Sequence, residues 1–283
     1  MAIYITKPWY KKSGRKGIWV PKTWSGLTNF DGEGVWTDGN NIYYSGYNGV
    51  VQNYVLDRSS STWTQKTWTG LGNSRISGRT VWTDGTNIFA SQYSSSTYSN
   101  YQKLLDVTNS SWSSITWNGL QEVYGYKGIW TDGTDIYHSN GSYHYRLNKG
   151  TYNWTQVNFS INYTSLNLQG NYVWTDNDGD VYYSGNEKNY AFDKSSKKWS
   201  TKTWSGINNN IINGVDIWTD GENTYESIYR DDYYSYYHYV LDKSTSTWNE
   251  KTWSGLSAFT GRNIWTDGDH IYYSSGTTQY ELT

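Results

Sequence analysis

The chain has 283 residues, no cysteine and a formal net charge of −2. Disulfides and thiolate metal sites are therefore excluded, and the total charge gives no reason to expect nucleic acid or an anionic membrane as a partner. Leu, Ile, Val and Phe make up only about a sixth of the residues, a share typical of disordered chains. However, the chain also has 18 Trp and 30 Tyr, and such rings bury about 150–250 Å² each. We therefore expect a folded protein with an aromatic core.

Residues 1–16 form a basic and aromatic arm without any acidic residue. No apolar run in the chain is long enough for a signal peptide or a membrane span. The arm is too apolar for a free solvated tail, so we expect it to anchor the protein to a larger assembly. A disordered tail and a weak, salt-sensitive DNA-binding arm are the alternatives. The expected anchoring residues are Ile3, Tyr4, Lys7, Trp9, Tyr10, Lys11, Lys12, Arg15 and Lys16.

The next stretch, residues 19–27, is nearly identical to a stretch near the end of the chain. It reads WVPKTWSGL, and residues 248–256 read WNEKTWSGL. Both contain two tryptophans five positions apart. An odd spacing places two side chains on opposite faces of a regular strand, so each ring is expected to pack against a different neighbouring sheet. The same pattern recurs as Trp63/Trp68, Trp112/Trp117, Trp154/Phe159 and Trp199/Trp204.

Residues 35–68 predict four strands. Residues 35–38, VWTD, form the first strand, and residues 38–41, DGNN, form a tight turn. Residues 42–45 and 54–57 are rich in β-formers and predict the second and third strands. The aromatic pair Trp63/Trp68 marks the fourth.

This unit repeats through the whole chain. The threonine of the Trp-Thr-Asp motif recurs every 44 to 48 residues, at Thr37, Thr83, Thr131, Thr175, Thr219 and Thr266. A repeat of this length is typical of β-propeller blades. The last unit stops at residues 280–283, after its third strand, and residues 19–24 can supply the missing fourth strand. We therefore predict an all-β, six-bladed β-propeller of four-stranded antiparallel blades over residues 17–283, closed by an N-terminal strand that completes the C-terminal blade.

The order of motifs resembles the kelch family of propellers. A kelch unit has a strand ending in two glycines, a strand with an aromatic residue and an acidic end, and then a tryptophan. Residues 42–46, residues 54–57 and Trp63 follow this order, although the glycine pair is reduced or lost, as at residues 91–92 and 227–228. The Tyr-, Trp- and Asn-rich repeats are also similar to those of tailed bacteriophages, which implies a virion protein of a tail or head appendage.

The repeated aspartate is the first candidate for chemistry, at Asp38, Asp84, Asp132, Asp176, Asp220 and Asp267. Carboxylate pairs can hydrolyse glycosidic bonds. An aspartate repeated at six hairpin corners is instead expected to bond nearby backbone amides. Nucleophile elbows, phosphate loops and a sialidase-type aspartate box are absent. The sequence therefore predicts a non-enzymatic protein without a cofactor, and a glycan lyase or hydrolase at the central channel is the alternative.

Metal sites are weakly indicated. Residues 176–180, DNDGD, are rich in oxygen ligands but lack the spaced glutamate of a calcium loop, and an extra hairpin residue also explains them. The histidines at positions 138, 144, 238 and 270 are not at metal-ligand spacing. No metal site is predicted, and calcium near Asp176–Asp180 is left open.

The units differ most in the connection between their second and third strands. It is longest at residues 91–102 and 227–238, and it lies on the same face as the blade-to-blade loops, which also carry Phe30, Lys127, Phe259 and Arg262. Tyr, Ser, Asn and Arg are typical of recognition loops on a rigid scaffold, although long loops can be tolerated insertions. The candidate binding residues are Tyr229, Arg230, Asp231, Asp232, Tyr233, Tyr234, Tyr236, Tyr237, Tyr93, Tyr98, Arg75, Arg79, Tyr124 and Tyr126.

The loop composition predicts a binding or structural module, and the resemblance to phage repeats implies a bacteriophage virion, or otherwise the extracellular space or cell surface. It is expected to occur in multiple copies and to contact other virion proteins through the arm. The loop face is expected to bind a host-surface glycan, a receptor or another virion protein. Nucleic acid and membrane insertion are not expected, and a structural adaptor without a small ligand is the second alternative.

Overall fold

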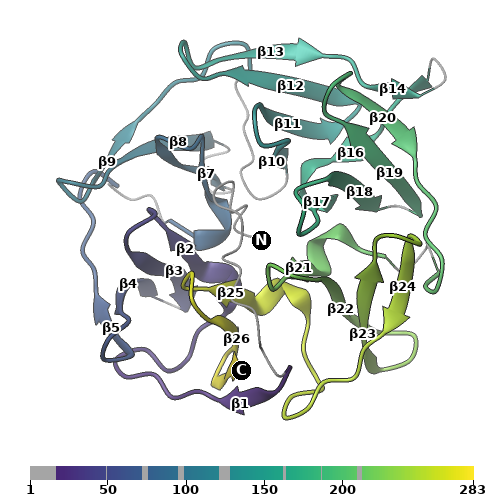
Figure 1. Cartoon of the computed structure of the whole chain (residues 1–283). Coiled ribbons are helices and arrows are strands. Elements are labelled where there is room, and N and C mark those ends of the chain that lie inside the picture. The colour runs from purple at the N-terminus through teal and green to yellow at the C-terminus, as the bar shows by residue number, and fades with distance from the viewer. Residues whose placement is uncertain are drawn as a thin grey trace.

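The computed structural model describes residues 17–48, 50–71, 76–94, 99–120, 128–161, 164–185, 187–208 and 212–283. These residues form six antiparallel blade sheets arranged around a central axis (Figure 1), and one separate two-stranded sheet. The predicted six-bladed β-propeller is confirmed. In the described part of the chain, no helix is both long enough and apolar enough to cross a membrane.

The first three blades follow one another in the sequence. The first contains β2 (Val35–Thr37), β3 (Ile42–Asn48), β4 (Val50–Asp57) and β5 (Thr62–Gln65). The second contains β6 (Val81–Thr83), β7 (Ile88–Ser94), β8 (Ser99–Asp106) and β9 (Ser111–Ser114). The third contains β10 (Ile129–Thr131), β11 (Ile136–Gly141), β12 (Tyr143–Asn148) and β13 (Asn153–Val157). Short strands β14 (Ser160–Ile161), β15 (Thr164–Ser165) and β16 (Leu168–Gln169) follow, and β16 pairs with β11.

The remaining blades have the same order of strands. The fourth contains β17 (Val173–Thr175), β18 (Val181–Gly185), β19 (Lys188–Asp193) and β20 (Lys198–Thr201). The fifth contains β21 (Ile217–Thr219), β22 (Thr224–Arg230), β23 (Ser235–Asp242) and β24 (Thr247–Glu250). The sixth contains β25 (Ile264–Thr266), β26 (Ile271–Ser275), β27 (Thr278–Leu282) and β1 (Trp19–Pro21).

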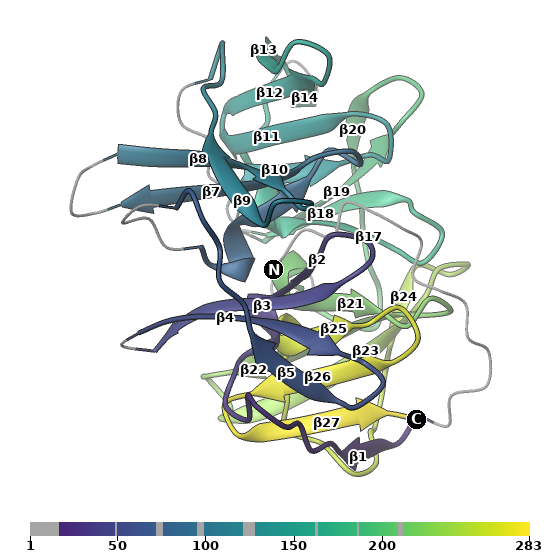
Figure 2. The same ribbon diagram turned by 90° about the vertical axis from the view of Figure 1, so that its left-hand side faces the viewer.

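Strand β1 closes the ring, as predicted. It pairs antiparallel with β27, with Trp19 opposite Leu282 and Pro21 opposite Tyr280, and Figure 2 shows the two strands side by side. The outer edge of the last sheet is therefore covered by the first strand of the chain. Covering this edge removes a template for pairing with other chains.

Short 3₁₀ helices precede the inner strands and surround the axis: η1 (Gly32–Gly34), η2 (Gly78–Thr80), η3 (Gly170–Tyr172), η4 (Gly214–Asp216) and η5 (Gly261–Asn263). Their glycines allow neighbouring blades to approach closely. A Cβ atom on Gly78 would lie 2.0 Å from the carbonyl oxygen of Gly34 in the blade before it. Only glycine fits at this contact.

The serine of the repeated hairpin has a structural role. In every blade, the tryptophan of the Trp-Thr-Asp motif donates its indole N–H to the hydroxyl of a fully buried serine on the next strand, over 2.8–3.1 Å. A buried indole N–H requires such a partner. The pairs are Trp36–Ser45, Trp82–Ser91, Trp130–Ser139, Trp174–Ser184, Trp218–Ser227 and Trp265–Ser274.

The repeated aspartate also has a structural role. In the first blade, Asp38 Oδ1 accepts the backbone N–H groups of Asn40 and Asn41 at 2.8 and 2.6 Å. The equivalent aspartate of each other blade accepts two backbone N–H groups in the same way. This is the geometry of an Asx turn, so the predicted turn role is confirmed.

The aromatic pairs pack as predicted, although not within one strand. Trp63 lies on β5 and packs in the core between the sixth and first blades, whereas Trp68 packs between the first and second. The expectation that both rings belong to one regular strand is wrong, because β5 ends at Gln65. Trp68 follows the strand, where the chain crosses to the next blade. Each pair therefore joins two of the six aromatic cores that lie between blades.

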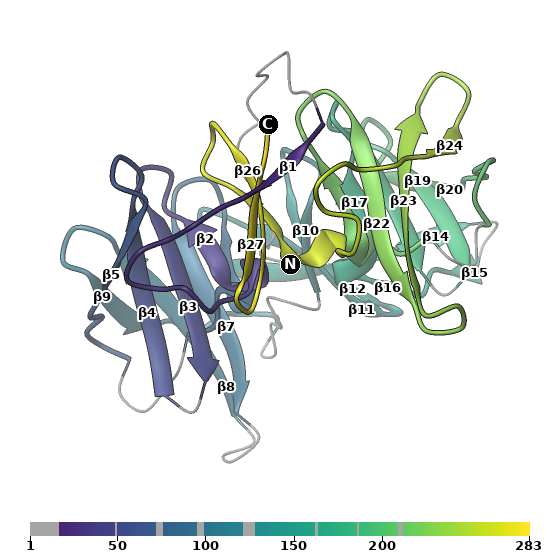
Figure 3. The same ribbon diagram turned by 90° about the horizontal axis from the view of Figure 1, so that it is seen from below.

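The antiparallel order of strands gives the disc two faces. We call the face with the hairpins between second and third strands the tip face; the connections from one blade to the next also lie there. We call the opposite face, with the Trp-Thr-Asp turns, the Asp-turn face. Figure 3 shows the β3–β4 and β22–β23 hairpins extending on the same side of the disc.

Candidate functional site

The β22–β23 hairpin is the clearest departure from the repeat. Sequence reasoning treated residues 227–238 as a loop, and this is wrong. The strands continue to Arg230 and restart at Ser235, so only residues 231–234 form the turn. Tyr229 lies opposite Tyr236 in the ladder. Aromatic residues favour a pleated strand, and cross-strand aromatic pairs stabilise it.

The end of this hairpin exposes a group of tyrosines. The exposed fractions of Tyr229, Tyr233, Tyr234 and Tyr236 are 41%, 60%, 83% and 40%. The rings of Tyr229 and Tyr236 pack against each other with centroids 4.9 Å apart. Exposed aromatic residues gathered in one patch are typical of interaction sites.

Arg230 fixes the geometry of the patch. Its guanidinium lies 4.6 Å from the ring centroid of Tyr233 and 5.7 Å from that of Tyr237. Its Nε donates to Asp232 Oδ1 at 3.1 Å. Cation–π contacts and a bidentate ion pair hold these side chains before any ligand arrives. We call residues 229–237 the tyrosine tip; Asp231 lies exposed in its turn.

Within the described residues, the other predicted binding residues do not form a single site with the tyrosine tip. Tyr93 lies on β7, which continues to Ser94, so the expected loop at residues 91–102 is also largely strand. Arg79 lies on η2 and forms an ion pair with Glu33 of η1. Arg75, Tyr98, Tyr124 and Tyr126 lie outside the described residues, as do Lys127 and the whole arm of residues 1–16.

Two aromatic residues expected on the exposed face are instead buried. Phe30 and Phe259 pack in the cores between blades, where burial of an aromatic ring is favourable. Arg262 binds the carboxylate of Asp216, with Nε–Oδ1 and Nη2–Oδ2 distances of 2.8 and 3.2 Å. Ion pairs between neighbouring blades therefore lie near the central axis on the tip face.

Sequence reasoning missed Glu226. This glutamate is fully buried on β22, and its Oε1 accepts the backbone N–H of Asn213 at 2.8 Å. Burial raises the pKa of Glu226 well above its usual range, and the nearby charge of Asp216 acts in the same direction. The repeat contained a signal for this residue. Three other blades have a tyrosine at the equivalent position, so a glutamate departs from the pattern; these residues are Tyr44, Tyr183 and Tyr273.

Replacing Glu226 with glutamine should stabilise the protein increasingly as the pH rises. A raised folded-state pKa favours folding below the unfolded-state pKa and loses that contribution as the pH rises through the folded-state pKa. Glutamine keeps the acceptor for Asn213 and cannot ionise. The difference in melting temperature between Glu226→Gln and wild type should therefore grow from pH 4 to pH 8. Glu222→Gln, at an exposed position in the same blade, is the control, and equal pH profiles for wild type and Glu226→Gln would contradict the prediction.

The histidines and the acidic turn provide no metal site in the described part of the chain. His138, His144 and His238 are buried, and burial lowers the pKa of His138 to about 4. At Asp176–Asp180, the ammonium of Lys243 lies 2.9 Å from carboxylate oxygens of Asp176 and Asp178 and 2.7 Å from one of Asp180. A lysine ammonium thus lies among the carboxylates of the turn where calcium was considered.

Solved structures share the propeller fold. The extracellular domain of the "putative hybrid two component system BT4673 from B. thetaiotaomicron" has a TM-score of 0.51 and 10% identity over 88% of this chain. The extracellular domain of a second such system from that bacterium, BT3049, has a TM-score of 0.50 and 10% identity over 88% of this chain. This chain spans 33% of the length of each. At this identity the likeness concerns the fold alone. No protein-family model and no curated protein matches the sequence.

Proposed function

We propose that this chain is a non-enzymatic binding module whose tyrosine tip recognises a bacterial-surface glycan. The observation that carries the proposal is the exposed tyrosine cluster held by Arg230. Tyrosine rings offer flat faces for the C–H side of a sugar ring, while Arg230, Asp231 and Asp232 offer donors and acceptors for its hydroxyls. Rigid tyrosines bind at low entropic cost.

The described carboxylates support binding rather than catalysis. Each repeated aspartate accepts backbone amides of its own turn, Asp216 is paired with Arg262, and Glu226 has no exposed surface. These carboxylates are held in structural contacts, whereas Asp231 and Asp232 lie exposed in the turn of the tip, where they can accept hydrogen bonds from a ligand.

The wider setting is part of the proposal. The kelch-like, phage-like style of the repeats supports a place in a virion appendage, where several copies would raise a weak single-site affinity by avidity. The anchoring of this assembly by residues 1–16 stays a prediction.

A glycan array tests the proposal. Wild type should bind O-antigen or capsular oligosaccharides, and the double variant Tyr233→Ala/Tyr236→Ala should lose at least about tenfold in affinity, a typical effect of removing aromatic anchors. Tyr143→Ala is the matched control, because this tyrosine is 64% exposed on another blade of the same face.

Either of two results would contradict the proposal: no binding by wild type to any surface glycan, or unchanged retention of the double variant. Binding only to a purified virion or cell-surface protein would replace the glycan with a protein partner.

A further inference from the structure

A pocket of about 300 Å³ lies on the Asp-turn face, between the sixth and first blades. This is the junction that β1 closes. The rings of Trp24 and Tyr272 and the side chain of Leu56 line part of it, and charged side chains of both signs line the rest. Small-molecule sites are typically about 300–1,000 Å³, with mostly apolar walls and a few polar groups.

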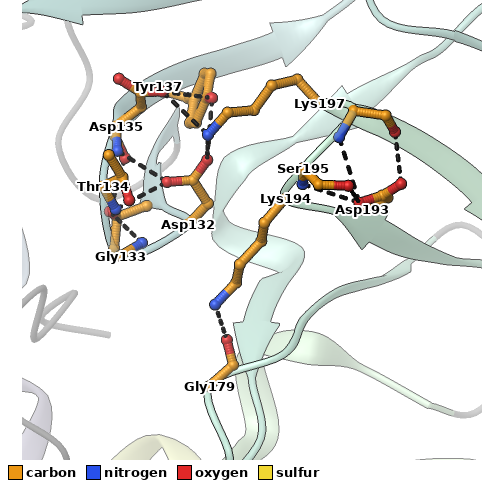
Figure 4. A network of polar contacts seen from close by, with 12 residues as sticks. Asp132, Gly133, Thr134, Asp135, Tyr137, Gly179, Asp193, Lys194, Ser195 and Lys197 are labelled. Carbon is orange, nitrogen blue, oxygen red and sulfur yellow. Dashed lines mark hydrogen bonds and ion pairs between the residues drawn. The ribbon is translucent and has the colours of Figure 1, made fainter.

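Three of the other junctions fill the corresponding niche with a side chain from the next blade. Between the third and fourth blades, Lys197 Nζ lies 2.6 Å from Asp132 and 3.1 Å from Asp135 (Figure 4). Between the fourth and fifth, Lys243 binds the acidic turn at 2.7–2.9 Å. Between the second and third, Tyr152 accepts the side-chain N–H of Asn87 at 3.0 Å.

The pocket lacks such a plug. Ser61 occupies the position of Tyr152 and Lys197, two residues before the tryptophan of the outer strand, and its side chain is too short to cross. Arg58 occupies the position of Lys243, but its Nη1 donates to the backbone carbonyl of Asp267 at 3.1 Å. Both carboxylates of the sixth-blade turn, Asp267 and Asp269, line the pocket.

The sixth blade also departs from the repeat at two positions that line the pocket. His270 stands where three blades have asparagine, and Glu281 stands where two blades have valine. Lys22 Nζ pairs with Glu281 at 3.2 Å. The equivalent lysines, Lys66 and Lys202, instead donate to a serine of the next blade at 2.7 Å. Glu281 therefore draws Lys22 away from Ser61 and leaves the niche open.

The geometry points to a binding site for a neutral, polyhydroxylated ligand of monosaccharide size in this pocket. Lys22, Arg58 and His270 provide donors, and Asp267, Asp269 and Glu281 provide acceptors. Several of these groups pair with one another. The pocket therefore offers hydrogen-bond donors and acceptors, while its positive and negative charges nearly balance. A sugar hydroxyl donates and accepts at once and matches such a mixture. The pocket is separate from the tyrosine tip, which lies on the opposite face.

Ligand-detected NMR with neutral monosaccharides tests the site, with free amino acids as zwitterionic probes. At least one hexose or deoxyhexose should bind wild type. The variant His270→Asn/Glu281→Val restores the repeat residues at both positions and should weaken that binding about tenfold or more, as expected when several hydrogen bonds to a ligand are lost. Ser61→Lys should also block it, because Lys197 adopts the same positive φ, 56° against 54° for Ser61, while plugging its own niche.

Tyr143→Ala, at an exposed tyrosine outside both candidate sites, is the matched control and should leave monosaccharide binding unchanged. The glycan array reports on the tip separately. Failure at one face is therefore distinguishable from failure at the other. Three results would overturn the inference: no neutral sugar binds wild type, the pocket variants retain full affinity, or amino acids bind in place of sugars.

Discussion

Trp19→Ala is expected to lower the free energy of unfolding by about 3–5 kcal/mol, the usual cost of removing a buried tryptophan. Trp19 is 1% exposed and packs against Trp218, Trp253 and Phe259, with ring centroids 6.2, 6.0 and 5.3 Å away. Trp218 and Trp253 belong to the repeat unit of the fifth blade, whereas Trp19 lies on β1 of the sixth. The substitution therefore weakens the packing between the fifth and sixth blades, at the strand that closes the ring.

Urea denaturation measures this effect. Val20→Ala is the control, since Val20 lies on the same strand, is 36% exposed and should cost less than about 1 kcal/mol. A loss of stability for Trp19→Ala no larger than that of the control would contradict ring closure by β1. The weakened variant should also aggregate more readily, because an opened ring exposes the edge of β27.

The fold could be predicted from the sequence because each blade repeats the same short sequence motifs. The Trp-Thr-Asp turn, the alternating strands and the aromatic pairs all recur at a fixed interval, and the near identity of residues 19–27 and 248–256 identified the closing strand. The function of Asp38 as a turn residue followed from the same symmetry. Repetition therefore fixed both the architecture and the role of its most repeated acid.

The errors arose where tertiary contacts override local composition. Residues 227–238 lengthen the connection relative to other blades, which suggested a loop, but tyrosines paired across the hairpin extend β22 and β23 instead. Phe30 and Phe259 lie in connections, yet the cores between blades bury them. Composition alone cannot distinguish an exposed aromatic residue in a connection from one that is packed between sheets.

The candidate sites were only partly predictable. The tyrosine tip was identified from the sequence, because it interrupts the repeat with a visible cluster. The pocket between the sixth and first blades was not identified, because it depends on which side chain crosses a junction between residues far apart in the sequence. Glu226 was missed because its significance lies in complete burial, which a single sequence does not show.

A large effect on glycan binding is expected from shortening the β22–β23 hairpin. Replacing residues 229–236 with Gly-Thr, the pair that joins β26 and β27, should abolish glycan binding while preserving the fold. Ile228 and Tyr237 are opposite each other in the ladder, so the shortened hairpin keeps its register. The melting temperature should change by no more than about 2–4 °C, which corresponds to about 1 kcal/mol in a domain of this size.

The most direct measurement compares this shortened variant with wild type on the same array of bacterial-surface glycans. We expect an intact propeller by circular dichroism and no retained glycan signal, because the proposed recognition site lies where one blade departs from the others. A folded variant that binds surface glycans as wild type does would contradict it.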